Sequence, residues 1–401
     1  DIFVDQMNKQ TLDDGTHYEL SFGYQLVSLI GFSDALRLGR VFGDEFPAEY
    51  SEKMRLQFHA IVKAMLPNGD TPNVNDGKLL DVKNSIKPFV DLFLGDDLLN
   101  FAVWGDKQSL SLPNFTSVHF QNAGFVLFRD GWSENSIAGF FDGGKFGKCH
   151  NHEDVIRCHQ HEDKLNFLMY IGKKNVICEA ESYAYDTSKM RYHVLSSAGH
   201  NTALVNGKGQ SRLCNNHWDD SMLHSVENVV FKDFGEVEFA SALYNEGYGE
   251  DAKLDATHER NIYFVKKPMQ GSPYFIVKDI LSSKDEKSFD IVWHYNTNKL
   301  DILDNKASCD ELTTFFAGEL GDITQYFGSS EPFAGWKANS FTQGDFAPIP
   351  TLYYNVKAKT AEVIFAFVPN IDGEFFVESV EYLDGVITVK YKNGEKLTID
   401  Y

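Results

Sequence analysis

The sequence HQHEDKLNFLMYIGKKNVICEAE, residues 159–181, decides the fold of the larger part of the chain. Apolar side chains alternate from Leu165 to Ile171, and a period of two is typical of a β-strand with one buried face. Residues 172–175, Gly-Lys-Lys-Asn, supply a turn, and a second apolar run begins at Val176. The stretch therefore predicts an antiparallel hairpin.

The same kind of pattern extends from Pro113 to the end of the chain, where short runs rich in Val, Ile, Phe and Tyr alternate with turn residues. The alternating residues 387–391 lead into Asn393-Gly394, a dipeptide that is a strong hairpin signal between two strands. We therefore predict an antiparallel β-sandwich over residues 113–401. Its last strands either join the sandwich or form a small separate C-terminal β unit.

Residues 1–112 follow a different period. Apolar side chains fall at helical spacing in three stretches, near residues 26–36, 54–65 and 86–93. Large apolar faces on successive helices imply helix-on-helix packing, so the predicted class is a multidomain α + β protein. The positions that carry this prediction are Leu26, Leu29, Ile30, Leu36, Met54, Phe58, Ile61, Met65, Ile86, Phe89, Val90 and Phe93.

The composition limits the classes of partner. The chain carries a formal net charge of −21 over 401 residues, so we expect no nucleic acid bound through bulk electrostatics. No apolar run reaches the roughly 20 residues that span a bilayer, so we expect no membrane partner. An acidic sugar polymer would need a local basic patch on this acidic body.

Histidines gather just before the predicted hairpin. Four fall between His150 and His161, and the H-x-H pair of His159 and His161 places both rings on one side of an extended chain. A carboxylate and a further histidine from neighbouring strands would complete a site of the kind that Zn²⁺ accepts. A bare H-x-H pair is also typical of surface or hydrogen-bonded histidines, so both interpretations stay open.

A longer pattern surrounds these histidines. It consists of H-x-H-x-D-x-L-x-F at residues 159–167, an acidic residue with a nearby tyrosine at 179–185, and His-Asn-Thr at 200–202. This pattern resembles the heparinase II/III-like β-sandwich domain. Phe-Arg-Asp-Gly-Trp at 128–132 is similar to the strand that opens that domain.

The helical part resembles the same family independently. Residues 14–24 are similar to the D-G-x-x-x-E-x-S-x-x-Y segment of the family's α/α toroid. Residues 67–76, which end in Asn75-Asp76, resemble its later P-D-G-x-x-P…D loop. The resemblance covers most of residues 10–300.

The resemblance implies a partial α/α toroid, a β-sandwich and a cleft between them, in a periplasmic or secreted polysaccharide lyase. Such an enzyme cleaves a uronate-containing acidic polysaccharide by β-elimination. Catalytic roles then fall to Tyr24 on the helical side and His159 on the sandwich side. Tyr185 is a second candidate phenol at the cleft, with core packing as its other interpretation. The candidate contacts to substrate are Arg191, Arg212, Gln210 and Asn201. The other interpretation is solvated surface charge for the two arginines and completion of strand ends for Gln210 and Asn201.

The resemblance also assigns a structural Zn²⁺ to His161, Glu179 and His200. At the second position the family usually has Asp in a D-x-G turn, whereas this chain has Glu179-Ala180-Glu181. Glutamate can also bind Zn²⁺, but its longer side chain requires a different backbone position.

Few residues precede Asp14, where the family's toroid has several more helices. We therefore expect either a fragment or a shortened protein. Its unpaired apolar helix faces would contact a missing N-terminal segment or a second copy of the chain.

Two other functions stay open at this point. An H-x-H pair with a glutamate and a distant histidine also describes a cupin dioxygenase or isomerase. Cupins place that glutamate a few residues after the pair, whereas Glu179 is 18 residues past His161. A non-catalytic carbohydrate-binding remnant is the other alternative. Bound iron would favour the cupin, and polymer binding without an unsaturated product would favour the remnant.

Overall fold

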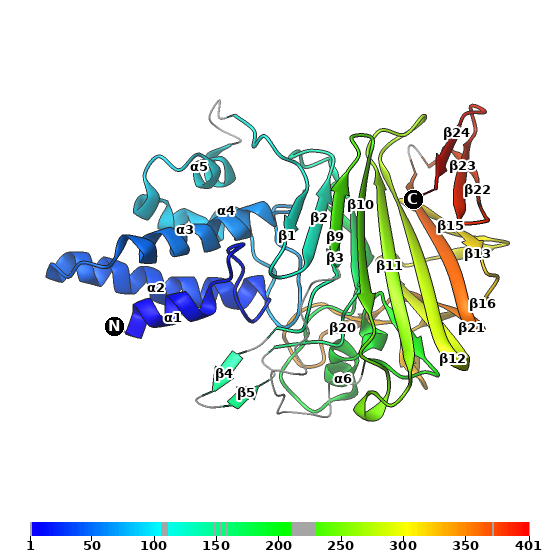
Figure 1. Ribbon diagram of the computed structural model, residues 1–401, viewed down its shortest axis with the longest axis horizontal. Helices are drawn as coiled ribbons and strands as arrows, with labels where there is room; N and C mark the ends of the chain where they lie inside the picture. Colours follow the sequence, from blue (N-terminus) through cyan, green and yellow to red (C-terminus); the bar gives the residue numbers. More distant parts are fainter. Residues whose placement is uncertain are drawn as a thin grey trace.

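The computed structural model describes residues 2–105, 111–147, 149–151, 154–156, 159–210, 229–370 and 373–400. Figure 1 shows helices on one side, a large β region beside them and the C-terminal strands at the far end. The first helices are α1 (Ile2–Gln10), α2 (Phe22–Phe42), α3 (Ala48–Lys63), α4 (Val82–Ile86), the 3₁₀ helix η1 (Lys87–Phe93) and α5 (Asp97–Trp104). Within these described ranges, no helix has both the length and the apolar character needed to cross a membrane.

The two long helices form where the apolar spacing predicts them. α2 begins after Ser21, whose hydroxyl accepts a hydrogen bond from the Tyr24 amide, and it ends at Gly43 with a φ of 79°. The third predicted helix is divided into α4 and η1 because Pro88 has no N–H to continue α-helical hydrogen bonding. Helices α1 and α5 lie outside the predicted stretches.

The helices pack against the first strands of the β region. One apolar cluster joins Leu29 and Phe58 of the helices with Phe125 and Phe140 of the strands. The outward face of α2 remains open, with exposed side chains that include Phe42, 78% exposed. The helical layer is therefore closed on the side of the sheet and apolar on the other.

Fifteen strands form the large sheet (Figure 1). They are β1 (Val118–Phe120), β2 (Phe125–Arg129), β3 (Ile137–Asp142), β6 (Phe167–Ile171), β7 (Lys174–Cys178), β8 (Ala203–Val205), β9 (Val230–Asp233), β10 (Val237–Tyr244), β11 (Ala256–Val265), β12 (Tyr274–Tyr295), β13 (Asp301–Leu303), β14 (Lys306–Ser308), β15 (Leu312–Gly318), β16 (Asp322–Phe327) and β21 (Pro350–Pro369). The long strands β12 and β21 pair antiparallel, with an irregularity between Ser282 and Lys287.

Shorter elements connect these strands. They are β4 (Cys149–Asn151) with β5 (Asp154–Ile156), β17 (Ser329–Ser330) with β18 (Phe333–Ala334), and β19 (Trp336–Ala338) with β20 (Phe346–Pro348). The remaining helices are α6 (Lys189–Leu195) and the 3₁₀ turns η2 (Ser197–Gly199) and η4 (Glu250–Ala252).

The predicted hairpin and the predicted sandwich are both confirmed. Strands β6 and β7 pair antiparallel, with Ile171 opposite Lys174. The ring of Phe167 on β6 lies 5.1 Å from that of Phe275 on β12, so the first strands face the long strands across the core. The two layers are nevertheless one continuous sheet, because β7 joins the end of β12 through two residue pairs.

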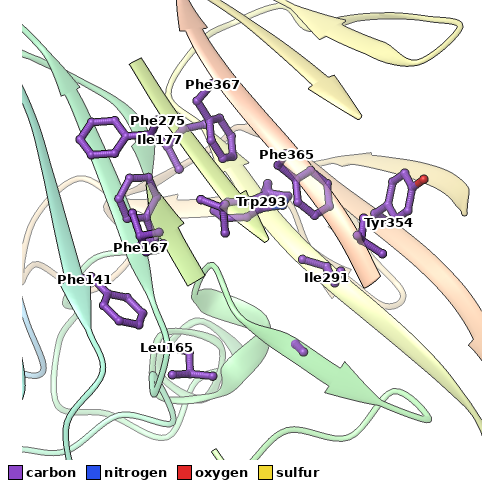
Figure 2. Packing of buried hydrophobic residues seen from close by; sticks show 14 of the residues in the cluster. Phe141, Leu165, Phe167, Ile177, Phe275, Ile291, Trp293, Tyr354, Phe365 and Phe367 are labelled. Atoms are coloured by element: carbon purple, nitrogen blue, oxygen red, sulfur yellow. The ribbon is translucent and has the colours of Figure 1, made fainter. Parts of the chain in front are cut away.

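Large aromatic residues fill the space between the layers (Figure 2). Trp293 is fully buried, and its ring centroid lies 5.3 Å from that of Phe365 and 4.7 Å from that of Phe367. These edge-on contacts are the favoured geometry for aromatic pairs. The β region thus contains a core of its own.

The last strands form a separate three-stranded sheet of β22 (Val377–Leu383), β23 (Val386–Tyr391) and β24 (Lys396–Ile399). Asn393 and Gly394 lie in the turn between β23 and β24, where the sequence places a hairpin. This sheet packs on the large one, and the hydroxyl groups of Tyr274 and Tyr391 lie 2.7 Å apart.

Candidate active site between the helices and the sheet

Tyr24 reaches the sheet from the first turn of α2. The start of this helix is anchored to the strands, because the ring of Phe22 contacts those of Phe120 and Phe125. The Ser21 hydroxyl caps the helix and also donates a hydrogen bond of 2.6 Å to the carbonyl of Asp76. The helix start is thereby fixed to the loop that contains Asp76, and Tyr24 is placed between the two parts of the molecule.

His159 approaches from the β side, in the loop before β6. Its ring lies flat on that of Tyr24, with centroids 3.5 Å apart and planes inclined by 16°. Its backbone has a φ of 59°, a left-handed conformation that is uncommon outside glycine. The carbonyl of His159 accepts a hydrogen bond of 2.8 Å from the Asp76 amide, which holds this conformation in place.

Tyr185 completes a group of three rings. Its hydroxyl lies 2.6 Å from that of Tyr24 and 3.3 Å from Nδ1 of His159. The side chain is 58% exposed, so core packing is not its role. Partial burial of the phenol and the nearby charge of Asp76 raise the pKa of Tyr185 well above its usual value. The structure thus brings together Tyr24, His159 and Tyr185.

Asp76 lies beneath this group. The sequence analysis placed it in a loop that resembles the family but assigned it no role. Its carboxylate accepts two hydrogen bonds from Arg191, of 2.6 and 2.7 Å. It also lies 3.1 Å from Nε2 of His161 and 3.7 Å from Nδ1 of His159. Burial alone would raise the pKa of Asp76, but the hydrogen bonds from Arg191 and the two histidines hold the pKa well below its usual range.

Comparison with protein families places this geometry in context. The profile of the heparinase II/III-like C-terminal domain matches residues 113–367, and the profile of the heparinase II/III N-terminus matches residues 1–101. The chain belongs to the heparinase II/III-like family. The resemblance seen in the sequence is therefore confirmed.

Known relatives of this heparinase II/III-like chain are distant and longer. A heparin-sulfate lyase of Bacteroides stercoris is 23% identical to it, in an alignment that covers all of this chain and 58% of the relative. A heparan sulfate lyase of Pedobacter heparinus, whose structure is solved, has 16% identity and a TM-score of 0.77. A structure of heparinase III has 18% identity and the same TM-score. Both structural matches cover the whole chain, and 61% and 62% of the other protein.

Three predicted contacts to substrate need correction. Arg191 is 9% exposed, and its guanidinium group is paired with Asp76, so we assign it the role of holding that carboxylate. Asn201 is fully buried, and its amide pairs with the backbone of Phe167, Cys178 and His294.

Gln210 is also fully buried, and its side chain pairs with the amide and the carbonyl of Lys164. Both amides stabilise the interior, because buried polar groups require such partners. The sequence around Asn201 and Gln210 did not indicate that their side chains would be buried. The fourth candidate, Arg212, lies outside the described residues.

The predicted zinc ligands lie next to one another beneath the ring group. Nδ1 of His200 is 2.8 Å from a carboxylate oxygen of Glu179, and the rings of His161 and His200 have centroids 5.3 Å apart. The nitrogen and oxygen donors are types that Zn²⁺ accepts, and Nδ1 of His161 is buried without a hydrogen-bond partner. In the described part of the chain, however, no three His, Cys, Asp or Glu side chains are arranged to hold one ion.

Proposed function

We propose that this chain contributes the reaction centre of a polysaccharide lyase that cleaves a uronate-containing acidic polymer by β-elimination, in the periplasm or outside the cell. The observation that carries the proposal is the contact of Tyr24 from the helices with His159 and Tyr185 from the β region. Family membership supports the reaction class. The relative from Bacteroides stercoris is named a heparin-sulfate lyase.

β-Elimination at a uronate requires two proton transfers. A base removes the proton at C5, the bond between C4 and the departing oxygen breaks, and a C4–C5 double bond forms. An acid then supplies a proton to the departing oxygen. Tyrosine suits both transfers where the site stabilises its charged form, and such catalysis typically contributes about 10²–10⁴-fold in rate.

Tyr24 is the proposed base. Its hydroxyl lies 2.6 Å from that of Tyr185, so a phenolate formed at Tyr24 would receive a short hydrogen bond from the Tyr185 hydroxyl. Because the pKa of Tyr185 is raised, this second phenol stays protonated at neutral pH and remains able to donate. Tyr185 is the proposed source of the proton for the departing oxygen because its hydroxyl lies beside the proposed base.

His159 is the proposed partner that positions both phenols. Its ring stacks on Tyr24, while Nδ1 lies within 3.3 Å of the Tyr185 hydroxyl. On its other side, Nε2 is 4.0 Å from a carboxylate oxygen of Glu19. Carboxylates of Glu19 and Asp76 therefore lie on two sides of the ring and hold it beside both phenols.

A panel of polymers tests the proposal. The full-length gene product would be incubated with alginate, heparan sulfate, hyaluronan and chondroitin sulfate while the ultraviolet absorbance of a 4,5-unsaturated uronate is followed. We expect the absorbance to rise with at least one polymer. No rise with any of them, together with retention of a polymer by the protein, would instead support the non-catalytic remnant.

We also propose that His161, Glu179 and His200, which are not arranged around one point in this structure, would move together to hold a structural Zn²⁺ ion. When bound, the ion would tie together the segments that carry these side chains and supply no step of the reaction. Elemental analysis of the purified protein should find about one zinc per chain in the parent and a marked loss in His200→Ala. Folded parent protein that contains no zinc after purification in zinc-supplemented buffer would contradict the assignment.

A further inference from the structure

A groove lies on the β side, close to the ring group. One cavity of about 570 Å³ is lined by Ser182 and Phe341, and the ring of Phe341 has its centroid 6.1 Å from that of Tyr185. A second cavity of about 590 Å³ shares Lys337 and Asn339 with the first. The two cavities are therefore neighbouring stretches of one groove. Each is within the roughly 300–1,000 Å³ of ordinary ligand pockets.

Glu181 lies in the wall of this groove in an unfavourable backbone conformation. Its φ is 61°, in the left-handed region that favours glycine and costs other residues free energy. A side chain kept at such a position points to a requirement for the side chain itself, because strained residues cluster at functional sites. The glutamate is partly buried, and its carboxylate faces the first cavity.

Two partners from different parts of the chain meet the carboxylate of Glu181. Asn73, from the loop after α3, donates a hydrogen bond of 2.8 Å to one of its oxygens. The ammonium group of Lys337 lies 3.7 Å from the other oxygen. Lys337 is held on β19, where the amide of the next residue, Ala338, donates a hydrogen bond of 2.9 Å to the carbonyl of Ala180.

Lys337 has the capacity for a further partner. Its distance to Glu181 exceeds a normal hydrogen bond, and an ammonium group has three donors. An acidic polymer bound to a chain of net charge −21 needs such a local cation. Arg191, whose guanidinium carbon lies 4.7 Å from the ring centroid of Tyr185, is already neutralised by Asp76.

We propose that Glu181 and Lys337 form the subsite for the sugar next to the cleaved bond, and that the pair determines specificity there. This inference rests on the proposed lyase function. Lys337 binds the acidic group of that sugar, and Glu181 accepts hydrogen bonds from its hydroxyl groups. Glu181 also disfavours a second anionic group on the same sugar, because like charges at this range repel.

Charge-specific variants test the subsite with the polymer that the full-length gene product cleaves best. Lys337→Met removes the charge and keeps the length, so KM should rise about tenfold while kcat stays within about twofold. Glu181→Gln should raise kcat/KM on highly sulfated heparin, relative to heparan sulfate, by roughly fivefold. Lys284→Met, which changes an exposed lysine far along β12, is the matched control.

A second pair of variants separates binding from folding. Glu181→Gly removes the strain of the left-handed backbone conformation, whereas Glu181→Ala retains that strain. Both substitutions remove the carboxylate. We expect both to change the preference between heparin and heparan sulfate in the same direction, although the glycine variant melts at a higher temperature than the alanine variant. A preference that follows the melting temperature would overturn the subsite and make Glu181 a structural residue.

The outcomes distinguish this inference from the proposed function. If the parent cleaves a polymer and Lys337→Met has an unchanged KM, the subsite is overturned. The proposed lyase function is then unaffected. If the parent cleaves no polymer, the lyase proposal fails, and retardation of the protein in gels that contain heparan sulfate tests the subsite alone. Equal retardation of the parent and Lys337→Met would then overturn it.

Discussion

The helical and β parts of the molecule differ in how completely each encloses its apolar side chains. In the β part, Trp293 is fully buried among other aromatic rings (Figure 2). In the helical part, Leu29 is fully buried on one face of α2, whereas Val41 and Phe42 near its end are 77% and 78% exposed. The β part thus has a closed core, whereas the helical part leaves apolar side chains of α2 in contact with solvent.

One ion pair from each part illustrates the range of burial, although the β part also has exposed pairs such as Lys284 with Asp255. Arg55 and Glu52 form an exposed pair along α3, and such pairs contribute little to stability. In the sheet, Arg260 and Asp279 form a pair that is completely buried, and His258 donates to the same carboxylate from 2.6 Å. Removing one member of such a buried pair typically costs about 3–5 kcal/mol.

The difference shows how the candidate site is held. Tyr24 belongs to the helical layer, but its position depends on the contacts of Phe22 with the strands and of Ser21 with the Asp76 loop. Asp76 in turn is held by Arg191 of α6, on the β side. The closed part of the molecule therefore positions Tyr24 of the open part.

The largest expected effect is a loss of turnover when the hydroxyl oxygen of Tyr24 is removed. Tyr24→Phe removes the hydroxyl that contacts Tyr185 but keeps the ring that stacks on His159. We expect turnover to fall by about 10²–10⁴-fold with an unchanged melting temperature. Tyr326→Phe, on β16, is the matched control and should retain full activity. Substantial activity in Tyr24→Phe would show that another group takes the proton.

The β architecture and much of the candidate site could be predicted from the sequence because they depend on local patterns. Alternation before Ile171 and the Asn393-Gly394 turn are properties of neighbouring residues, and the structure has strands at both places. Tyr24, His159 and Tyr185 were reached through the family pattern, and the structure brings them together.

Other features depend on contacts between distant residues and have no local signal. The pair of Asp76 and Arg191 joins positions 115 residues apart, and neither spacing nor composition indicates it. The burial of Asn201 and Gln210 is decided by how strands and loops pack, so their polarity alone suggested exposure. The break between α4 and η1 could have been predicted from Pro88.

The second prediction tests the closed core directly. Trp293→Ala removes a fully buried ring that contacts Phe365 and Phe367. We expect the free energy of unfolding to fall by about 3–5 kcal/mol, because burial is lost and a cavity remains. Denaturation in urea, monitored by far-ultraviolet circular dichroism, measures the change. A loss below about 1 kcal/mol would mean that the core repacks and is not rigidly closed.

The third prediction uses pH to isolate the buried ion pair. Burial would raise the pKa of Asp279, but Arg260 and His258 lower it from 3.8 to about 2. The unfolded chain therefore takes up the proton first as the pH falls. The resulting contribution of about 2 kcal/mol is complete above about pH 4 and is lost between pH 4 and pH 2.

Urea denaturation of the parent and of Asp279→Asn across this range measures that contribution. The variant is expected to be less stable at neutral pH, because Arg260 loses its charged partner. It should also lack the part of the acid dependence that arises between pH 4 and pH 2. Equal slopes for the two proteins in this range would exclude Asp279 as the source.

The smallest expected effect on stability concerns the open face of α2. Val41 and Phe42 already contact water in the folded chain, so replacing both with serine should change the free energy of unfolding by only about 0.5 kcal/mol. Self-association should respond more strongly, because exposed apolar patches of this kind favour contact with another chain. Sedimentation of residues 1–401 should show concentration-dependent association that the double variant weakens. Leu320→Ser, at an equally exposed position of the β part, should leave association unchanged, and an equal response of both variants would remove the distinction between the open and closed parts.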